Sequence, residues 1–137
     1  MIESLKKKTK LTINKIFEQK GESFFRILEE KITLEEVRKK NKVISLGGGA
    51  FMNKKIRDHV VSYTKSFWLN LNTDLLSKRL INSNKRPLLV GKNIRSILEK
   101  IYTERKSTYA LANYKIDCNN LTSDLIVNKI IKLYEND

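Results

Sequence analysis

Three short apolar runs alternate with longer segments of helical periodicity, and this alternation most constrains the fold of the 137-residue chain. The runs cover residues 43–46, 67–71 and 114–118. Each is too short for a helix and is typical of a strand buried in a sheet. Apolar residues elsewhere recur every three or four positions, which predicts helices over about 12–19, 22–40, 53–63, 73–80, 93–109 and 122–133. Strands that alternate with helices indicate an α/β domain with a parallel sheet.

A glycine and several polar residues mark the boundaries of these helices. Gly21 separates the first two helical segments. Side chains that accept hydrogen bonds from the first backbone N–H groups of a helix are expected at Asn53, Thr73, Asn93 and either Thr122 or Ser123.

The net charge of +13 first suggests a nucleic acid or membrane partner, but its distribution does not. Of 28 basic residues only 7 are Arg, which leaves 21 Lys, and these are scattered along the chain. Scattering favours a compositional bias over a groove for a polyanion. No apolar run approaches the ~20 residues that span a bilayer, and the first residues lack the apolar region of a signal peptide. A single cysteine, Cys118, fits a reducing cytoplasm.

The strand predicted at 43–46 leads directly into Gly47, Gly48 and Gly49. Glycines let the backbone approach a ligand closely and present N–H groups to an anion. In doubly wound folds, ligands bind at this carboxyl end of the strands. A plain tight turn is the alternative interpretation.

Arg26 and Glu29 lie three residues apart, on one face of a predicted helix. A guanidinium that is held by one carboxylate is preorganised to bind a second one with two parallel hydrogen bonds. The alternative is an ordinary surface ion pair.

Residues 82–92 are polar and basic and contain the only proline, which predicts a mobile lid. Pro87 stiffens the backbone next to Arg86, and Leu88 can be buried when the loop closes. Such a lid delivers a cation and excludes water, although an ordinary basic loop has the same composition. Arg105 lies on the following helix, where a solvated position is the alternative.

In order and spacing, these motifs resemble the shikimate kinase family over nearly the whole chain. The resemblance rests on Phe-Arg-x-x-Glu at 25–29, the strand and glycines at 43–49, Arg86-Pro87-Leu88, and the strand at 114–118. It implies one domain over residues 1–137, with a three-layer α/β/α parallel sheet of the P-loop kinase type.

The resemblance also implies roles for individual residues. Arg26 and Arg105 would bind the carboxylate of shikimate, with Glu29 holding Arg26 in place. The backbone of Gly48 and Gly49 would contact the substrate. Arg86 would be catalytic and would reach the transferred phosphoryl group. Arg79, seven residues earlier, would pack on adenine as part of the ATP site. The walls around the substrate ring would be Phe17, Phe25, Pro87 and Leu88.

The implied reaction is ATP-dependent phosphorylation of the 3-hydroxyl of shikimate, a step towards chorismate and the aromatic amino acids. ATP and Mg²⁺ are implied as cofactors, and a cytoplasmic monomer that binds neither nucleic acid nor membrane is expected. Phosphoryl transfer depends mainly on positioning and charge neutralisation, which a set of Arg residues can supply.

The chain departs from the family pattern in one large respect. No Gly-x-x-x-x-Gly-Lys-Ser/Thr phosphate loop is present, so the first strand and this loop are expected to be missing from the fold. We therefore expect an N-terminally incomplete form, with Met1 an internal methionine, that is inactive and poorly soluble alone. In addition, Asn119-Asn120 stands where the family often has an Arg near adenine.

Two rival functions remain open: a related small-molecule kinase, and a non-catalytic binding protein that is either a degenerate remnant or a nucleic-acid binder. A related gluconate-type kinase would share the fold and the lid, although Phe-Arg-x-x-Glu followed by three glycines argues against it. A non-catalytic, degenerate remnant would explain the absent phosphate loop. A basic nucleic-acid binder is disfavoured because no stripe of aromatic and basic residues is present.

Overall fold

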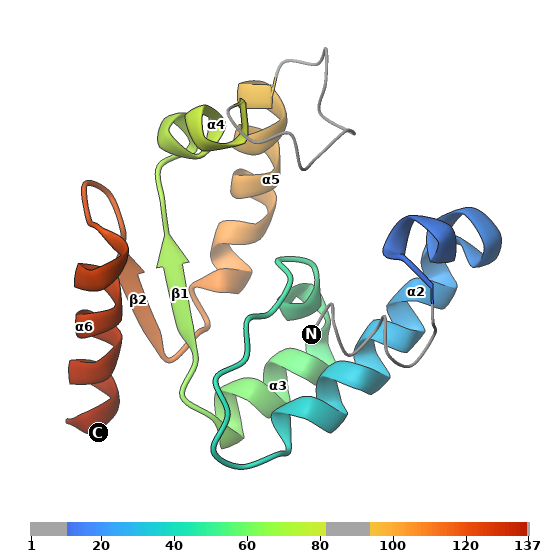
Figure 1. The fold of residues 1–137 in the computed structure, drawn as a ribbon, viewed down its shortest axis with the longest axis horizontal. Helices are drawn as coiled ribbons and strands as arrows, with labels where there is room; N and C mark the ends of the chain where they lie inside the picture. Colours follow the sequence, from blue (N-terminus) through green and yellow to red (C-terminus); the bar gives the residue numbers. More distant parts are fainter. Residues whose placement is uncertain (1–10, 82–93, 137) are drawn as a thin grey trace. The chain divides into compact units, whose positions relative to one another are not determined.

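The computed structural model describes residues 11–81 and 94–136, which form two compact units divided between Thr64 and Lys65. The first unit contains helices α2 (Ile13–Val37) and α3 (Lys54–Tyr63) and the short 3-10 turn η1 (Ala50–Met52). The second contains strands β1 (Phe67–Asn70) and β2 (Tyr114–Asp117) and helices α4 (Thr73–Ile81), α5 (Ile94–Tyr109) and α6 (Ser123–Glu135). Figure 1 labels the helices α2 to α6 and both strands. The single domain expected over 1–137 stays a prediction.

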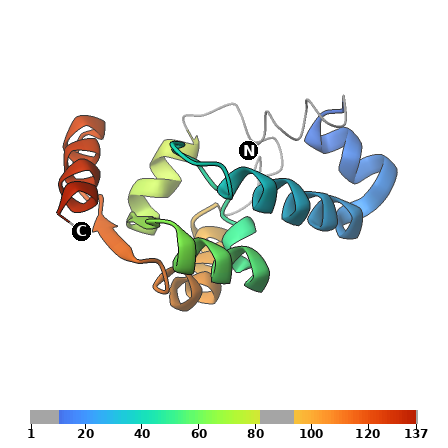
Figure 2. The same ribbon diagram turned by 90° about the horizontal axis from the view of Figure 1, so that it is seen from below.

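Helix α2 consists of two helical segments that meet at Gly21, as the sequence predicted. Gly21 has φ 78° and ψ 171°, a backbone conformation that is essentially restricted to glycine. The first turns, in the darkest blue, therefore run in a different direction from the rest of the helix (Figures 1 and 2). The two segments share a core of Ile16, Phe25 and Ile32, against which Leu11, Ile13, Phe17 and Leu28 pack.

Helix α3 packs against the second segment of α2 and begins where the sequence predicted. The side chain of Asn53 accepts hydrogen bonds from the N–H groups of Lys55 (2.9 Å) and Ile56 (3.2 Å), which confirms it as the N-cap. Ile56 and Val60 are the buried residues of this helix.

The strand predicted at residues 43–46 is not formed, and that prediction is wrong. The segment has no regular structure, Val43 is fully exposed, and burial alternates between exposed and half-buried positions. A strand is stabilised by a hydrogen-bonded neighbour, and among the described residues the only strand pair is β1 with β2. The apolar pattern alone therefore did not make a strand here.

In the second unit, β1 and β2 pair in parallel, with Phe67 opposite Tyr114 and Asn70 opposite Asp117. Both strands fall where the sequence predicted, and the α/β class with a parallel sheet is confirmed. Ile116 in β2 is buried. Helix α6 carries apolar side chains that are largely exposed in this unit: Leu125, Val127, Ile131 and Tyr134.

The helix starts in this unit were predicted with partial success. Thr122 is the N-cap of α6, because its hydroxyl accepts from the N–H of Leu125. The predicted N-cap Thr73 is wrong by one residue, since the side chain of Asn72 accepts from the N–H of Asp74 at 2.7 Å. Asn93 lies outside the described residues. Within the described ranges, no helix combines the length and the apolar character needed to cross a bilayer.

Candidate functional site

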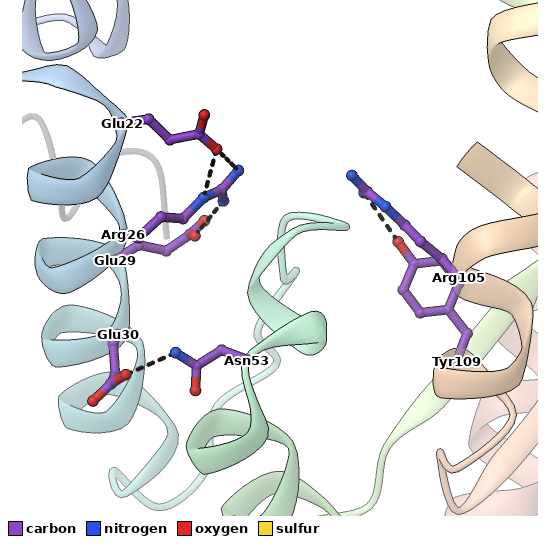
Figure 3. Close-up of polar contacts among 7 residues, drawn as sticks. All are labelled: Glu22, Arg26, Glu29, Glu30, Asn53, Arg105 and Tyr109. Atoms are coloured by element: carbon purple, nitrogen blue, oxygen red, sulfur yellow. Dashed lines mark hydrogen bonds and ion pairs between the residues drawn. The ribbon is translucent and has the colours of Figure 1, made fainter. Parts of the chain in front are cut away.

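The candidate site is centred on Arg26, whose guanidinium is held by two carboxylates of α2 (Figure 3). Nη1 donates to Glu29 Oε2 at 2.7 Å. Nε and Nη2 donate to Glu22 Oε1 at 3.3 and 3.2 Å. Glu29 is buried and Glu22 is exposed, so the two carboxylates differ in how firmly they are placed. The pairing predicted between Arg26 and Glu29 is thus present.

Arg26 keeps its positive charge in this setting. Partial burial lowers the pKa of Arg26, but the hydrogen bonds and charges of Glu29 and Glu22 together raise it above its ordinary value. The Arg26 side chain remains 44% exposed, so it is accessible to a ligand while it is fixed on one side by Glu29. Such a half-buried, oriented fork is suited to binding an anion.

The glycine turn lies directly against this guanidinium. A Cβ atom added to Gly49 would lie only 2.7 Å from Arg26 Nη1. The turn is closed by hydrogen bonds from Ala50 N to Gly47 O (2.9 Å) and from Met52 N to Gly49 O (3.1 Å). The structure thus brings together Arg26, Glu29 and Gly49, as the sequence predicted, with the exposed Gly48 in the same turn.

Two residues that hold this turn were missed by sequence reasoning. Arg57 Nη1 donates to the carbonyls of Phe51 (3.1 Å) and Met52 (3.0 Å). Glu30 Oε2 accepts from Asn53 Nδ2 at 2.7 Å and so ties the end of the turn to α2 (Figure 3). The partners Glu30 and Asn53 are 23 residues apart, and no local spacing pattern could have indicated the contact.

Glu22 was also missed, although a signal existed. Its position four residues before Arg26 is a spacing at which side chains on a helix meet.

Of the predicted aromatic walls, Phe25 lies next to Arg26 and Phe17 packs on Phe25. The rings of Phe17 and Phe25 are 4.6 Å apart between centroids, and Arg26 Cζ lies 5.3 Å from the centroid of Phe25. Phe25 is buried and Phe17 half-buried. An apolar surface thus adjoins the guanidinium.

Arg105 belongs to the second unit. On α5 its Nη1 lies 3.5 Å from the hydroxyl of Tyr109 (Figure 3). The ring of Tyr109 is in turn 6.0 Å from that of Trp68 in β1. Arg105 is half-buried rather than a solvated surface residue.

The remaining predicted residues belong to α4 and to the predicted lid. Arg79 is exposed on α4. Arg86, Pro87 and Leu88, with the whole predicted lid at 82–92, lie outside the described residues. Within residues 11–81 and 94–136, no three His, Cys, Asp or Glu side chains are grouped so that they could hold a metal ion.

Comparison with known proteins places the chain in a family. The family model described as shikimate kinase matches residues 3–135. Shikimate kinase of Mesorhizobium japonicum is 32% identical over 123 residues, which are 90% of this chain and 61% of that protein. Shikimate kinase of Bartonella quintana is 32% identical over 134 residues, 98% of this chain and 64% of that one. The chain therefore spans less than two thirds of the length of these curated relatives.

Solved structures give the same answer for the fold. A shikimate kinase from Acinetobacter baumannii, solved in complex with shikimate, superimposes with a TM-score of 0.88 at 28% identity, covering 98% of this chain and 76% of that one. The enzyme from Bacteroides thetaiotaomicron gives a TM-score of 0.82 at 27% identity, covering 98% and 79%. The α/β fold expected from the sequence is thus that of solved shikimate kinases, and the chain belongs to the shikimate kinase family.

Proposed function

We propose that this chain binds shikimate and supplies the acceptor side of an ATP-dependent kinase that phosphorylates the 3-hydroxyl of shikimate. The observation that carries the proposal is the guanidinium of Arg26, which is oriented by the buried Glu29 and adjoined by Gly49 and Phe25. Family membership supports the same reading, and the Acinetobacter baumannii relative was solved with shikimate bound.

The chemistry of shikimate matches this site. Shikimate carries one carboxylate on a small ring with hydroxyl groups. A guanidinium fork binds a carboxylate through two parallel hydrogen bonds. The half-buried ring of Phe17, which packs on the buried Phe25, is proposed as an apolar surface for the substrate ring, and the backbone of Gly48 and Gly49 is proposed to contact the substrate.

The other residues have proposed roles that follow the family resemblance. Arg105 is proposed as the second ligand of the carboxylate, and Pro87 and Leu88 as further walls. On the nucleotide side, Arg79 is proposed to pack on adenine and Arg86 to neutralise charge on the transferred phosphoryl group. Positioned cations are what phosphoryl transfer chiefly requires.

ATP is proposed as the cosubstrate, with Mg²⁺ as its metal ion. The described residues do not form a site that could bind the metal by themselves. They contain no grouping of three potential ligands, and the 137 residues contain no Gly-x-x-x-x-Gly-Lys-Ser/Thr motif. We therefore assign no step to a metal bound by this chain. A cytoplasmic monomer that acts on small molecules completes the proposal.

Isothermal titration of the 137-residue chain with shikimate tests the proposal, with gluconate as the comparator. Saturable binding of shikimate and much weaker binding of gluconate are expected, because only the first presents its carboxylate on a rigid ring. Binding of gluconate alone would instead support a gluconate-type kinase. Absence of shikimate binding by a folded chain would overturn the proposal.

A further inference from the structure

Glu22 occupies an edge of the Arg26 guanidinium that is suited to binding a carboxylate. Arg26 presents Nη1 to the buried Glu29 and the other edge of its fork, Nε and Nη2, to Glu22. That second edge presents two parallel N–H groups, the arrangement that binds a carboxylate through two hydrogen bonds. A single oxygen, Glu22 Oε1, accepts from both of its nitrogens (Figure 3).

The two carboxylates are not equivalent. The Glu29 bond is short, at 2.7 Å, and the side chain of Glu29 is only 7% exposed. The Glu22 bonds measure 3.2 and 3.3 Å, and its side chain is 66% exposed. Glu29 is therefore a fixed support, whereas Glu22 can rotate into water at little cost.

Backbone geometry sets Glu22 at this place. It follows Gly21 directly, at the start of the second segment of α2, and this puts it one helical turn before Arg26. Glu22 thus reaches Arg26 from an element that is itself fixed by the core around Phe25 and Ile32.

We propose that Glu22 is an internal competitor for the substrate carboxylate: it holds the fork of Arg26 in the free protein and is displaced when the ligand binds. This inference rests on the proposed function, since it concerns the same guanidinium. Glu22 then sets the affinity of Arg26 for its ligand and selects for anionic ligands. Only a carboxylate replaces the Arg26–Glu22 ion pair that is lost on binding.

Titration of shikimate into three variants tests the competition. Glu22→Gln removes the charge that competes, and we expect binding about two- to fivefold tighter, the range that an exposed ion pair is worth. Glu22→Asp keeps the net charge but shortens the side chain, and it should also tighten binding. The matched control is Glu18→Gln, an identical charge change at an exposed position of α2, which should leave the affinity unchanged.

The methyl ester of shikimate tests whether Glu22→Gln acts through the carboxylate of the ligand or changes binding in general. The ester has no carboxylate, so Glu22→Gln should give no gain for it. Weaker or unchanged shikimate binding by both Glu22 variants would overturn the competition, as would an equal gain with Glu18→Gln. Failure of the unsubstituted chain to bind shikimate would instead overturn the proposed function, and the competition with it.

Discussion

The guanidinium of Arg26 lies so close to the backbone of Gly49 that a methyl group there would come within 2.7 Å of Nη1. The backbone of Gly49 itself, with φ −72° and ψ −30°, is one that any residue adopts. Glycine is therefore needed at this position for space and not for conformation. The guanidinium of Arg26 fills the space beside Gly49, so the position of the glycine turn and that of the guanidinium depend on each other.

Gly49→Ala is expected to damage binding more than it damages the fold. The added methyl group must push the flexible end of Arg26 away from its place beside Glu29. Loss of one hydrogen bond to a charged group, worth about 1.5–3 kcal/mol, predicts roughly 10- to 100-fold weaker shikimate binding. The free energy of unfolding should fall by no more than about 1–3 kcal/mol, because the buried Glu29 loses its partner, and the restriction of the unfolded chain by Ala offsets about 0.4–1 kcal/mol of that loss. Titration and urea denaturation measure the two quantities, and an unchanged affinity would contradict the contact.

Gly21→Ala should have the opposite effect, so the two glycines serve as controls for each other. A Cβ at Gly21 would meet nothing within 4 Å, but the residue has a φ of 78° and a ψ of 171°. Holding an L-residue in such a region costs about 1–3 kcal/mol. We expect the free energy of unfolding to fall by that amount in urea denaturation. An equally stable variant would show that the bend in α2 does not depend on glycine.

Local patterns predicted well those features whose causes are local. The bend at Gly21 and the caps at Asn53 and Thr122 each depend on a residue and its next few neighbours. The ion pair of Arg26 with Glu29 is equally local, since one helical turn brings the two side chains together. The local spacing predicted this ion pair, and the resemblance to shikimate kinase made it the centre of a candidate site.

Features that depend on distant partners could not be predicted in this way. The run at 43–46 has the apolar pattern of a strand, yet a strand also needs a neighbour, and none of the described residues pairs with it. The hydrogen bond between Glu30 and Asn53 joins residues that only the packing of α2 on α3 brings together. The close approach of Gly49 to Arg26 likewise arises from tertiary structure.

Arg26→Lys keeps the charge but loses the fork, and we expect a large loss of shikimate affinity. A Lys ammonium cannot donate two parallel bonds to one carboxylate. Truncating a buried charged partner costs about 2–5 kcal/mol, and the half-exposed Arg26 should lie near 2 kcal/mol, roughly thirtyfold in affinity. Arg38→Lys, the same change at an exposed position of the first unit, is the control and should bind normally. Equal affinities for both variants, measured by titration, would remove Arg26 from the site.

Acid should weaken the first unit in a defined pH range, because Glu36 accepts hydrogen bonds from Lys39 (2.6 Å) and Lys42 (3.1 Å). These bonds, with that of Lys39 first, lower the pKa of Glu36 from 4.5 to about 2. A carboxyl with a depressed pKa stabilises the folded state above its unfolded pKa, and this contribution is lost as the pH falls. The contribution of Glu36 should therefore disappear between about pH 4.5 and about pH 2.

Melting temperatures measured across that range should separate the unsubstituted chain from Glu36→Gln. The variant lacks the titrating group, so its melting temperature should fall less steeply with acid. Parallel curves would mean that the ion pairs of Glu36 contribute nothing to stability, as is the case for many exposed pairs.

Cys118 should report on the integrity of the second unit, because its thiol is protected in the folded chain. The residue is only 4% exposed and follows β2 directly. Burial, and then the charge of Asp117, raise the pKa of the Cys118 thiol, so little of the reactive thiolate is present at neutral pH. Iodoacetamide should therefore modify the native chain far more slowly than the chain in concentrated urea, as followed by mass spectrometry. Because the chain has one cysteine, the modified fraction measures opening of this unit directly. Native and urea-treated chains that react equally fast would show that the end of β2 is open to solvent.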